Sequence, residues 1–114
     1  MDRLFITELC SGKNAFYLKP AAAVVSARRA GTTATFDQLN KYFTMSQMPV
    51  VSSQYWNMVH GNTPDEVKQD IEGLQTMRTL GRNMAYILKC QEAGRKNGVQ
   101  PPEREEQIET NFIR

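Results

Sequence analysis

The stretch AAAVVSARRAGTT, residues 21–33, decides how this chain folds. Residues 21–27 are apolar apart from one serine, and their side chains are small or β-branched. Such a run is typical of a strand that is buried on both faces of a parallel sheet. Residues 28–33 are polar and include a glycine, so we expect the strand to end in a loop there.

A helix and a second strand are expected next along the chain. Apolar residues recur at helical spacing over 34–46, and Thr33 or Thr35 can cap the start of that helix. The run MPVVSS that follows contains a second short apolar stretch. It predicts a second buried strand near 49–53.

The remaining helices are indicated by their ends. Thr63, Pro64 and Glu66 form the signature of a helix start, with an N-cap, a proline at the first position and a capping box. Apolar residues then recur every three or four positions, which predicts a long helix over 65–93. Near the start of the chain, residues 2–9 have the pattern of the last turns of a helix.

The alternation of strands and helices predicts the fold class. Strands that alternate with helices form βαβ units, which right-handed crossovers join into a mostly parallel sheet. We therefore expect one α/β unit over 1–98, followed by a polar tail over 99–114. Two strands are too few for a stable parallel sheet. The chain is therefore expected either to pair with another chain, such as a second copy of itself in a dimer, or to be part of a larger fold.

Composition excludes several classes of function. The 114 residues carry a formal net charge of +2, which is too small for a protein that binds nucleic acid or an anionic membrane. The two cysteines, Cys10 and Cys90, lie far apart in the sequence and belong to no metal-binding motif. No apolar run is long enough to span a bilayer, and the first residues do not resemble a signal peptide. We expect a cytoplasmic protein without a metal site.

The first candidate binding loop is 27–33, because ligands of open α/β sheets bind at the carboxyl ends of the strands. It contains two arginines, a glycine and two threonines at the start of a helix. These groups are able to hold an anion or the polar edge of a heterocycle. The alternative is an ordinary strand-to-helix turn with solvated arginines.

The second candidate loop, 54–62, is rich in aromatic residues. Trp56 is able to form a wall for a flat ligand, with Asn57 and His60 supplying hydrogen bonds. The alternative is that Trp56 and Met58 fill the core and that His60 lies at the surface or caps a helix. No serine or cysteine is placed for nucleophilic catalysis, so no catalytic side chain is predicted.

Two segments of the sequence resemble a known family. AAAVVSARRAGTTATFDQLNKYF (21–43) and MPVVSSQYWNMVHGNTPDEVKQDIEGLQTMRTLGRNMAYILK (48–89) are similar to the C-terminal half of the flavodoxin-like NAD(P)H-dependent FMN reductases. The relatives of this family include multimeric NAD(P)H:quinone reductases and iron–sulfur flavoproteins. The resemblance covers about residues 20–114, and QYWNMVHGNTP (54–64) is its most specific part.

The resemblance implies a fold, a cofactor and its contacts. The fold is an α/β, flavodoxin-like doubly wound parallel sheet, of which this chain would supply only the C-terminal β-α-β-α half. The implied cofactors are FMN and NAD(P)H. Because the flavin carries out the hydride chemistry, the protein supplies position and electrostatics. The implied cofactor-binding residues are Ala27, Arg28, Arg29, Ala30, Gly31, Thr32 and Thr33 beside the isoalloxazine ring, with Trp56, Asn57 and His60 near the flavin or across a dimer interface.

The sequence also departs from the family. The phosphate-binding loop that follows the family's first strand is missing, as are the cysteines that hold a cluster in the iron–sulfur members. The resemblance therefore implies part of an FMN-dependent NAD(P)H oxidoreductase, which passes hydride from nicotinamide to flavin and on to an acceptor when assembled with the missing half. The alternative is a truncated, non-enzymatic assembly module that has lost flavin binding.

Overall fold

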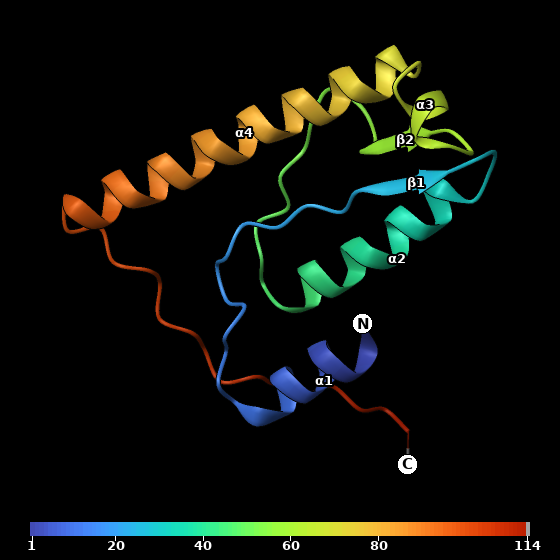
Figure 1. Cartoon of the computed structure of the whole chain (residues 1–114). Helices are drawn as coiled ribbons and strands as arrows, with labels where there is room; N and C mark the ends of the chain where they lie inside the picture. The colour runs from blue at the N-terminus through green and yellow to red at the C-terminus, as the bar shows by residue number, and fades with distance from the viewer. Residues whose placement is uncertain (114) are drawn as a thin grey trace.

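The computed structural model describes residues 1–113, and it confirms an α/β arrangement of helices around parallel strands. The elements are α1 (Asp2–Ser11), β1 (Val25–Ala27), α2 (Thr32–Met45), β2 (Met58–His60), α3 (Pro64–Val67) and α4 (Ile71–Lys96). In Figure 1, α4 lies on one side of the strand pair, whereas α2 and α1 lie on the other. Within this arrangement α2 contacts β1, and α4 contacts β2.

The described residues form one sheet of two parallel strands. β1 pairs with β2 in a register that places Val25 opposite Met58. An isolated parallel bridge joins Ala21 to Val50 upstream of this pair. The parallel direction and the position of the first strand therefore agree with the prediction, because β1 and the bridge both lie within residues 21–27.

The second strand does not lie where the sequence indicated. We expected it near 49–53, but that segment contributes only the bridge at Val50, and β2 begins eight residues further along the chain. Three residues separate Ala21 from Val25 on the first strand, whereas seven separate Val50 from Met58 on the second. The extra residues bulge out of the ladder between the two points of pairing.

Hydrogen bonds to side chains hold this bulge. The Ser53 hydroxyl lies 2.6 Å from the carbonyl oxygen of Tyr55 and 2.7 Å from Oδ1 of Asn57. It also accepts from the backbone N–H of Tyr55 at 3.3 Å. Such local bonds give the backbone partners outside the ladder. They explain why pairing is interrupted after the apolar run and resumes only at β2.

Only one face of the first strand is covered. Ala21, Ala23 and Val25 are buried, the first two of them against residues of α1 and α2. Val24 points to the other face and is 51% exposed, and Ser26 is exposed as well. Burial on both faces was expected, and that expectation is wrong because α4 packs against β2 and leaves this face of β1 open.

An aromatic cluster joins α1 to α2. The ring centroid of Phe5, on α1, lies 4.8 Å from that of Phe16 and 5.3 Å from that of Tyr42. The ring of Phe43, on α2, lies 6.2 Å away. The Tyr42 hydroxyl also donates a hydrogen bond to the carboxylate of Asp2. The predicted helix over 2–9 is therefore real, and Phe5 fastens it to the core.

The ends of the last two helices follow the sequence signals in part. Thr63 caps α3 as predicted, because its hydroxyl accepts from the backbone N–H of Glu66 at 3.3 Å. The Glu66 carboxylate accepts from the N–H of Asn62 at 2.6 Å, one residue before the cap. The predicted helix over 65–93 is divided into α3 and α4, since Asp70 caps a new helix start.

Replacing Phe5 with alanine is expected to lower the free energy of unfolding by about 3–5 kcal/mol, because it removes a buried ring from the contact between α1 and α2. Ile6→Ala is the matched control, since the Ile6 side chain is 46% exposed; its effect should stay within about 0.5 kcal/mol. Urea unfolding followed by circular dichroism measures both values. Equal losses in the two variants would contradict the role of Phe5.

Candidate functional site

The carboxyl ends of β1 and β2 lie side by side. Ala27 and His60 are register partners at these ends, and the N–H of Gly61 donates to the carbonyl oxygen of Ala27 at 3.2 Å. The loops that follow the two strands therefore leave the same edge of the sheet. This edge is where open α/β sheets bind their ligands.

The loop between β1 and α2 is open to solvent. Arg28, Arg29 and Ala30 are exposed, and Gly31 has the left-handed φ of 92° with no heavy atom within 4 Å of the place a Cβ would occupy. Gly31 is also the N-cap of α2, and no side chain caps this helix. A flat ligand is therefore able to approach the loop backbone and the N–H groups at the start of α2.

The threonines of this loop do not act as predicted. Neither Thr33 nor Thr35 caps α2; the Thr35 hydroxyl donates to the carbonyl oxygen of Gly31 at 2.9 Å. Thr32 is only 5% exposed, so its side chain is packed into the protein. The polar side chains of this loop that a ligand can reach are those of the two arginines and Thr33.

Trp56 and Asn57 lie at the opposite end of the strand pair from this loop. Both precede β2, because that strand begins at residue 58. Trp56 is 49% exposed, and its ring centroid lies 4.9 Å from that of Tyr55. The core role considered for Trp56 is thus wrong, whereas Met58 is buried. Of the predicted residues in the second loop, only His60 lies beside the end of β1.

Asn57 stabilises the sheet from inside the protein. Its residue is 2% exposed, and its Oδ1 atom lies 2.7 Å from the Ser53 hydroxyl. Its carbonyl oxygen accepts from the N–H of Val25 at 3.0 Å. The side chain therefore holds the bulge together, the backbone carbonyl joins it to β1, and the geometry assigns Asn57 a structural role.

Asp70 is a site residue that the sequence reasoning missed. Its carboxylate accepts from the N–H of His60 at 2.7 Å and from the N–H of Gly73 at 2.9 Å. The His60 ring nitrogen Nδ1 lies 3.9 Å from the same carboxylate. Asp70 thus ties the end of β2 to the start of α4. An aspartate directly before the apolar Ile71 is an N-cap signal that could have found it.

Hydrogen bonding makes Asp70 more acidic. The N–H of Gly73 and the N–H of His60 stabilise the carboxylate and lower its pKa below the ordinary 3.8, with a smaller contribution from the His60 charge. Partial burial acts in the opposite direction and is outweighed. The absence of a Cβ at Gly73 matters here, because a Cβ would collide with the Asp70 carboxylate.

A small cavity lies beside His60 and Asp70. Its volume is about 130 Å³. The lining residues are Tyr55, Met58, His60, Asp70, Glu72, Gly73 and Thr76. No residue of the 27–33 loop lines it, so the structure does not gather the two predicted loops around one cavity. Across residues 1–113, no three His, Cys, Asp or Glu side chains are placed to hold a metal ion, and no helix is long and apolar enough to cross a membrane.

The comparisons with known proteins relate the chain to flavoproteins. The chain is 32% identical over 74 residues to an iron–sulfur flavoprotein of Methanocaldococcus jannaschii. The alignment covers 60% of this chain and 38% of the flavoprotein, so the chain spans well under half the length of that relative. No family model and no solved structure matches the chain.

Asp70→Ala is expected to lower the free energy of unfolding by about 1–2 kcal/mol at neutral pH, because it leaves two backbone N–H groups without their acceptor. Since folding lowers this pKa, the stabilisation is complete above pH 3.8 and is lost as pH falls through the folded-state pKa below it. Urea unfolding at several pH values should show that the difference in free energy of unfolding between wild type and variant becomes smaller at acid pH.

Asp65→Ala is the control for that experiment, because the Asp65 side chain is 85% exposed and pairs only with Lys68 among the described residues. Its effect should be within about 0.5 kcal/mol at every pH. A gap for the Asp70 variant that stays constant down to acid pH would contradict the role assigned to the carboxylate.

Proposed function

We propose that this chain forms one wall of the flavin site of an FMN-dependent NAD(P)H oxidoreductase. The observation that carries the proposal is the 32% identity to an iron–sulfur flavoprotein. The resemblance of 21–43 and 48–89 to FMN reductases points the same way. The open edge formed by the ends of β1 and β2 is the place in the described structure that suits such a ligand.

The loop between β1 and α2 fits the ring edge of a flavin. The isoalloxazine ring presents carbonyl oxygens and ring nitrogens that accept hydrogen bonds, and the uncapped start of α2 offers N–H donors. Gly31 leaves open space where a side chain would block a flat ring. Arg28 and Arg29 are exposed on the same loop, and their positive charges stabilise negative charge on the ring.

The division of chemistry follows from this placement. When bound, FMN accepts and passes on the hydride, while the protein positions the ring and sets the field around it. In the proposal, the 28–31 backbone orients the ring edge, and Asp70 keeps the neighbouring end of β2 in place. No phosphate-binding loop is recognised in the sequence, so the phosphate is anchored by another polypeptide segment.

The ring-edge placement predicts that this chain binds riboflavin and FMN equally well, within about threefold, because the phosphate has no partner in it. Gly31→Ala should weaken the binding of both flavins by about tenfold or more. The new methyl group would lie against the ring, and a side chain is strained at the positive φ of this position. Fluorescence titration of the purified full chain measures the four affinities. FMN binding that exceeds riboflavin binding and disappears in Arg28→Ala would show that the orientation is reversed.

Gly98→Ala is the matched control for this titration. Gly98 also has a positive φ, 83°, with nothing within 4 Å of a Cβ, and it lies at the end of α4. Its variant should bind both flavins like the wild type. A folded, colourless chain that binds neither flavin favours the non-enzymatic assembly module. Bleaching of the flavin-loaded protein by NADH or NADPH without oxygen tests the oxidoreductase activity itself.

The proposal also requires a partner that completes the sheet. The face of β1 that carries Val24 is uncovered, and one edge of this strand is unpaired among residues 1–113. The radius of gyration is 17.4 Å, whereas a compact chain of this length has about 13 Å. An open apolar edge is a template for pairing with another strand. We infer association with a second copy as a dimer or with a polypeptide that supplies the missing half.

Light scattering at micromolar concentration should therefore give a mass above the 13.0 kDa of the monomer. Val24→Lys places a charge on the uncovered face of β1 and should shift the protein toward monomer. Val99→Lys is the control, because Val99 is 64% exposed and lies beyond α4. A folded wild-type species at the monomer mass would refute the association.

A further inference from the structure

α4 carries a row of basic side chains on one face. Arg78, Arg82, Lys89 and Lys96 are separated by four or seven residues, so they lie along one side of the helix. All four are exposed. Lys96 pairs with Glu92 at 2.7 Å, whereas Arg78, Arg82 and Lys89 form no ion pair within residues 1–113. We call these three residues, with Lys96, the basic row.

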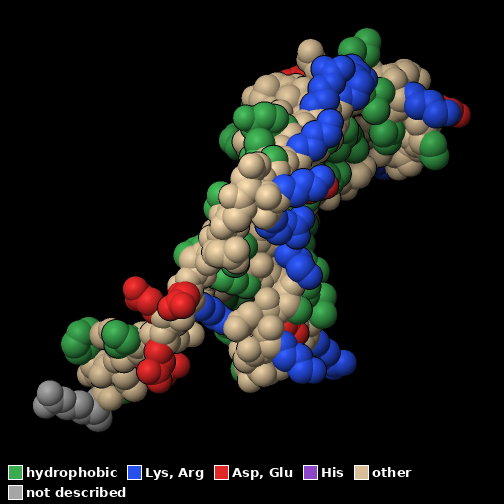
Figure 2. All heavy atoms as spheres, turned by 90° about the vertical axis from the view of Figure 1, so that its left-hand side faces the viewer, with side chains coloured by type: hydrophobic (Ala, Val, Ile, Leu, Met, Phe, Trp, Pro, Cys, Tyr) green, Lys and Arg blue, Asp and Glu red, His purple; other side chains and the backbone are tan. Residues whose placement is uncertain are grey.

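The tail that follows α4 has the opposite charge. Residues 103–113 contain four glutamates and one arginine, and they form neither helix nor strand. Ile108 and Phe112 are apolar but 91% and 90% exposed. In Figure 2 several acidic side chains gather on this tail, at the lower left. The segment is thus acidic, extended and equipped with exposed apolar side chains.

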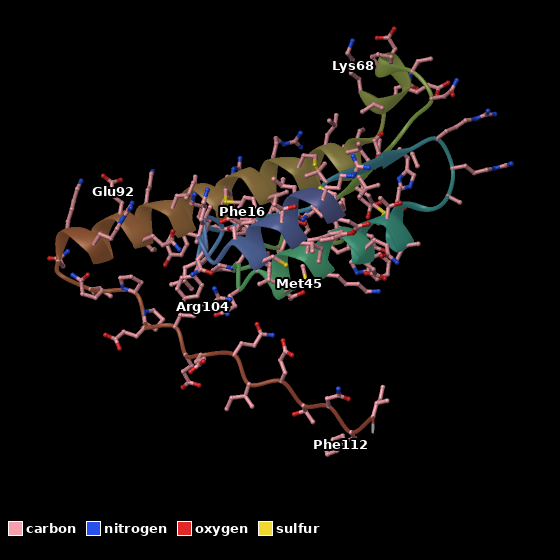
Figure 3. The ribbon with its side chains drawn as sticks, turned by 90° about the horizontal axis from the view of Figure 1, so that it is seen from below. Phe16, Met45, Lys68, Glu92, Arg104 and Phe112 are labelled. Carbon is pink, nitrogen blue, oxygen red and sulfur yellow. The ribbon has the colours of Figure 1, made fainter. Side chains whose placement is uncertain are left out.

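The tail is held away from the α4 helix of its own chain. The hydroxyl of Tyr17 donates to the carbonyl oxygen of Pro102 at 3.2 Å, which directs the chain past the end of α1. Figure 3 shows the segment from Arg104 to Phe112 extending away from α4, and residues 103–107 line a cavity together with Leu9 of α1 and Met45 of α2. The acidic tail therefore does not reach the basic row of its own chain in this arrangement.

We propose that the tail, residues 103–113, binds along the basic row of a second copy of this chain. Charge complementarity selects this occupant, because the acidic segment and the basic row belong to the same molecule and do not meet within it. In a two-fold pair each tail reaches the partner's α4, so the contact is made twice. The same acidic tail would repel a nucleic acid or an anionic membrane from the row.

The lengths and the order of side chains set a direction for the tail. The ten residues from Glu103 to Phe112 span about 30 Å when extended, and the nineteen helical residues from Lys89 back to Ile71 span about 27 Å. A tail that runs antiparallel to α4 therefore places its glutamates beside Lys89, Arg82 and Arg78. It places Phe112 beside Ile71, which is 76% exposed on the same side of α4.

A charge exchange tests the pairing in the full-length chain. Arg82→Glu with Lys89→Glu, and separately Glu105→Lys with Glu106→Lys, should each weaken self-association by about tenfold or more, because like charges then face each other. Mixing the two variants restores opposite charges at both contacts. Their mixed association should return to within about threefold of the wild type, measured by sedimentation equilibrium.

The control variant carries Lys13→Glu with Lys41→Glu, two exposed lysines outside α4, and should associate like the wild type. Carbodiimide coupling of a mixture of isotope-labelled and unlabelled wild-type chains gives a second readout. We expect bonds between Lys89 and tail glutamates that join labelled to unlabelled peptides. Bonds within single chains only, or variants that associate like the wild type, would overturn the proposal.

Discussion

The parallel pairing of β1 with β2 is the constraint on which the rest of the structure depends. A parallel pair has no hairpin, so its strands must be joined by a helix that crosses over the sheet, and α2 is that helix. The crossover fixes which face α2 covers and leaves the other face to α4. α2 covers one face of β1, and α4 covers the opposite face of the sheet at β2. The second face of β1 therefore stays open, and Val24 is exposed there.

Much of this arrangement follows from local sequence signals. The apolar run over 21–27 contains β1, the spacing of apolar residues gives α2, and Thr63 caps α3 as expected. These signals involve residues within one helical turn or one strand, so they can be recognised in the sequence without knowledge of tertiary contacts. The exposure of the second face of β1 was not predictable in this way, because an apolar run does not show which helices pack against the strand.

The candidate site was harder to predict because of the bulge before β2. An apolar run at 49–53 is the stronger strand signal, yet the pairing of Ser53 with Asn57 diverts the chain there. This diversion separates Trp56 from the 27–33 loop and buries Asn57. Periodicity carries no information about such a bond between two polar side chains. The 27–33 loop lies where it was predicted, because β1 lies within the predicted strand over 21–27.

The open loop and the open strand edge have one physical origin. A flavin ring that rests on 28–31 alone would keep most of its surface in water, and water weakens every charge interaction that could tune the ring. In the proposed function, a polypeptide that covers the exposed face of β1 would also adjoin the carboxyl end of that strand, where the loop begins. Completing the sheet and enclosing the ring are thus a single step in the proposed function. Flavin affinity should therefore rise with association, because the same partner provides both the missing strand contacts and the second wall of the site.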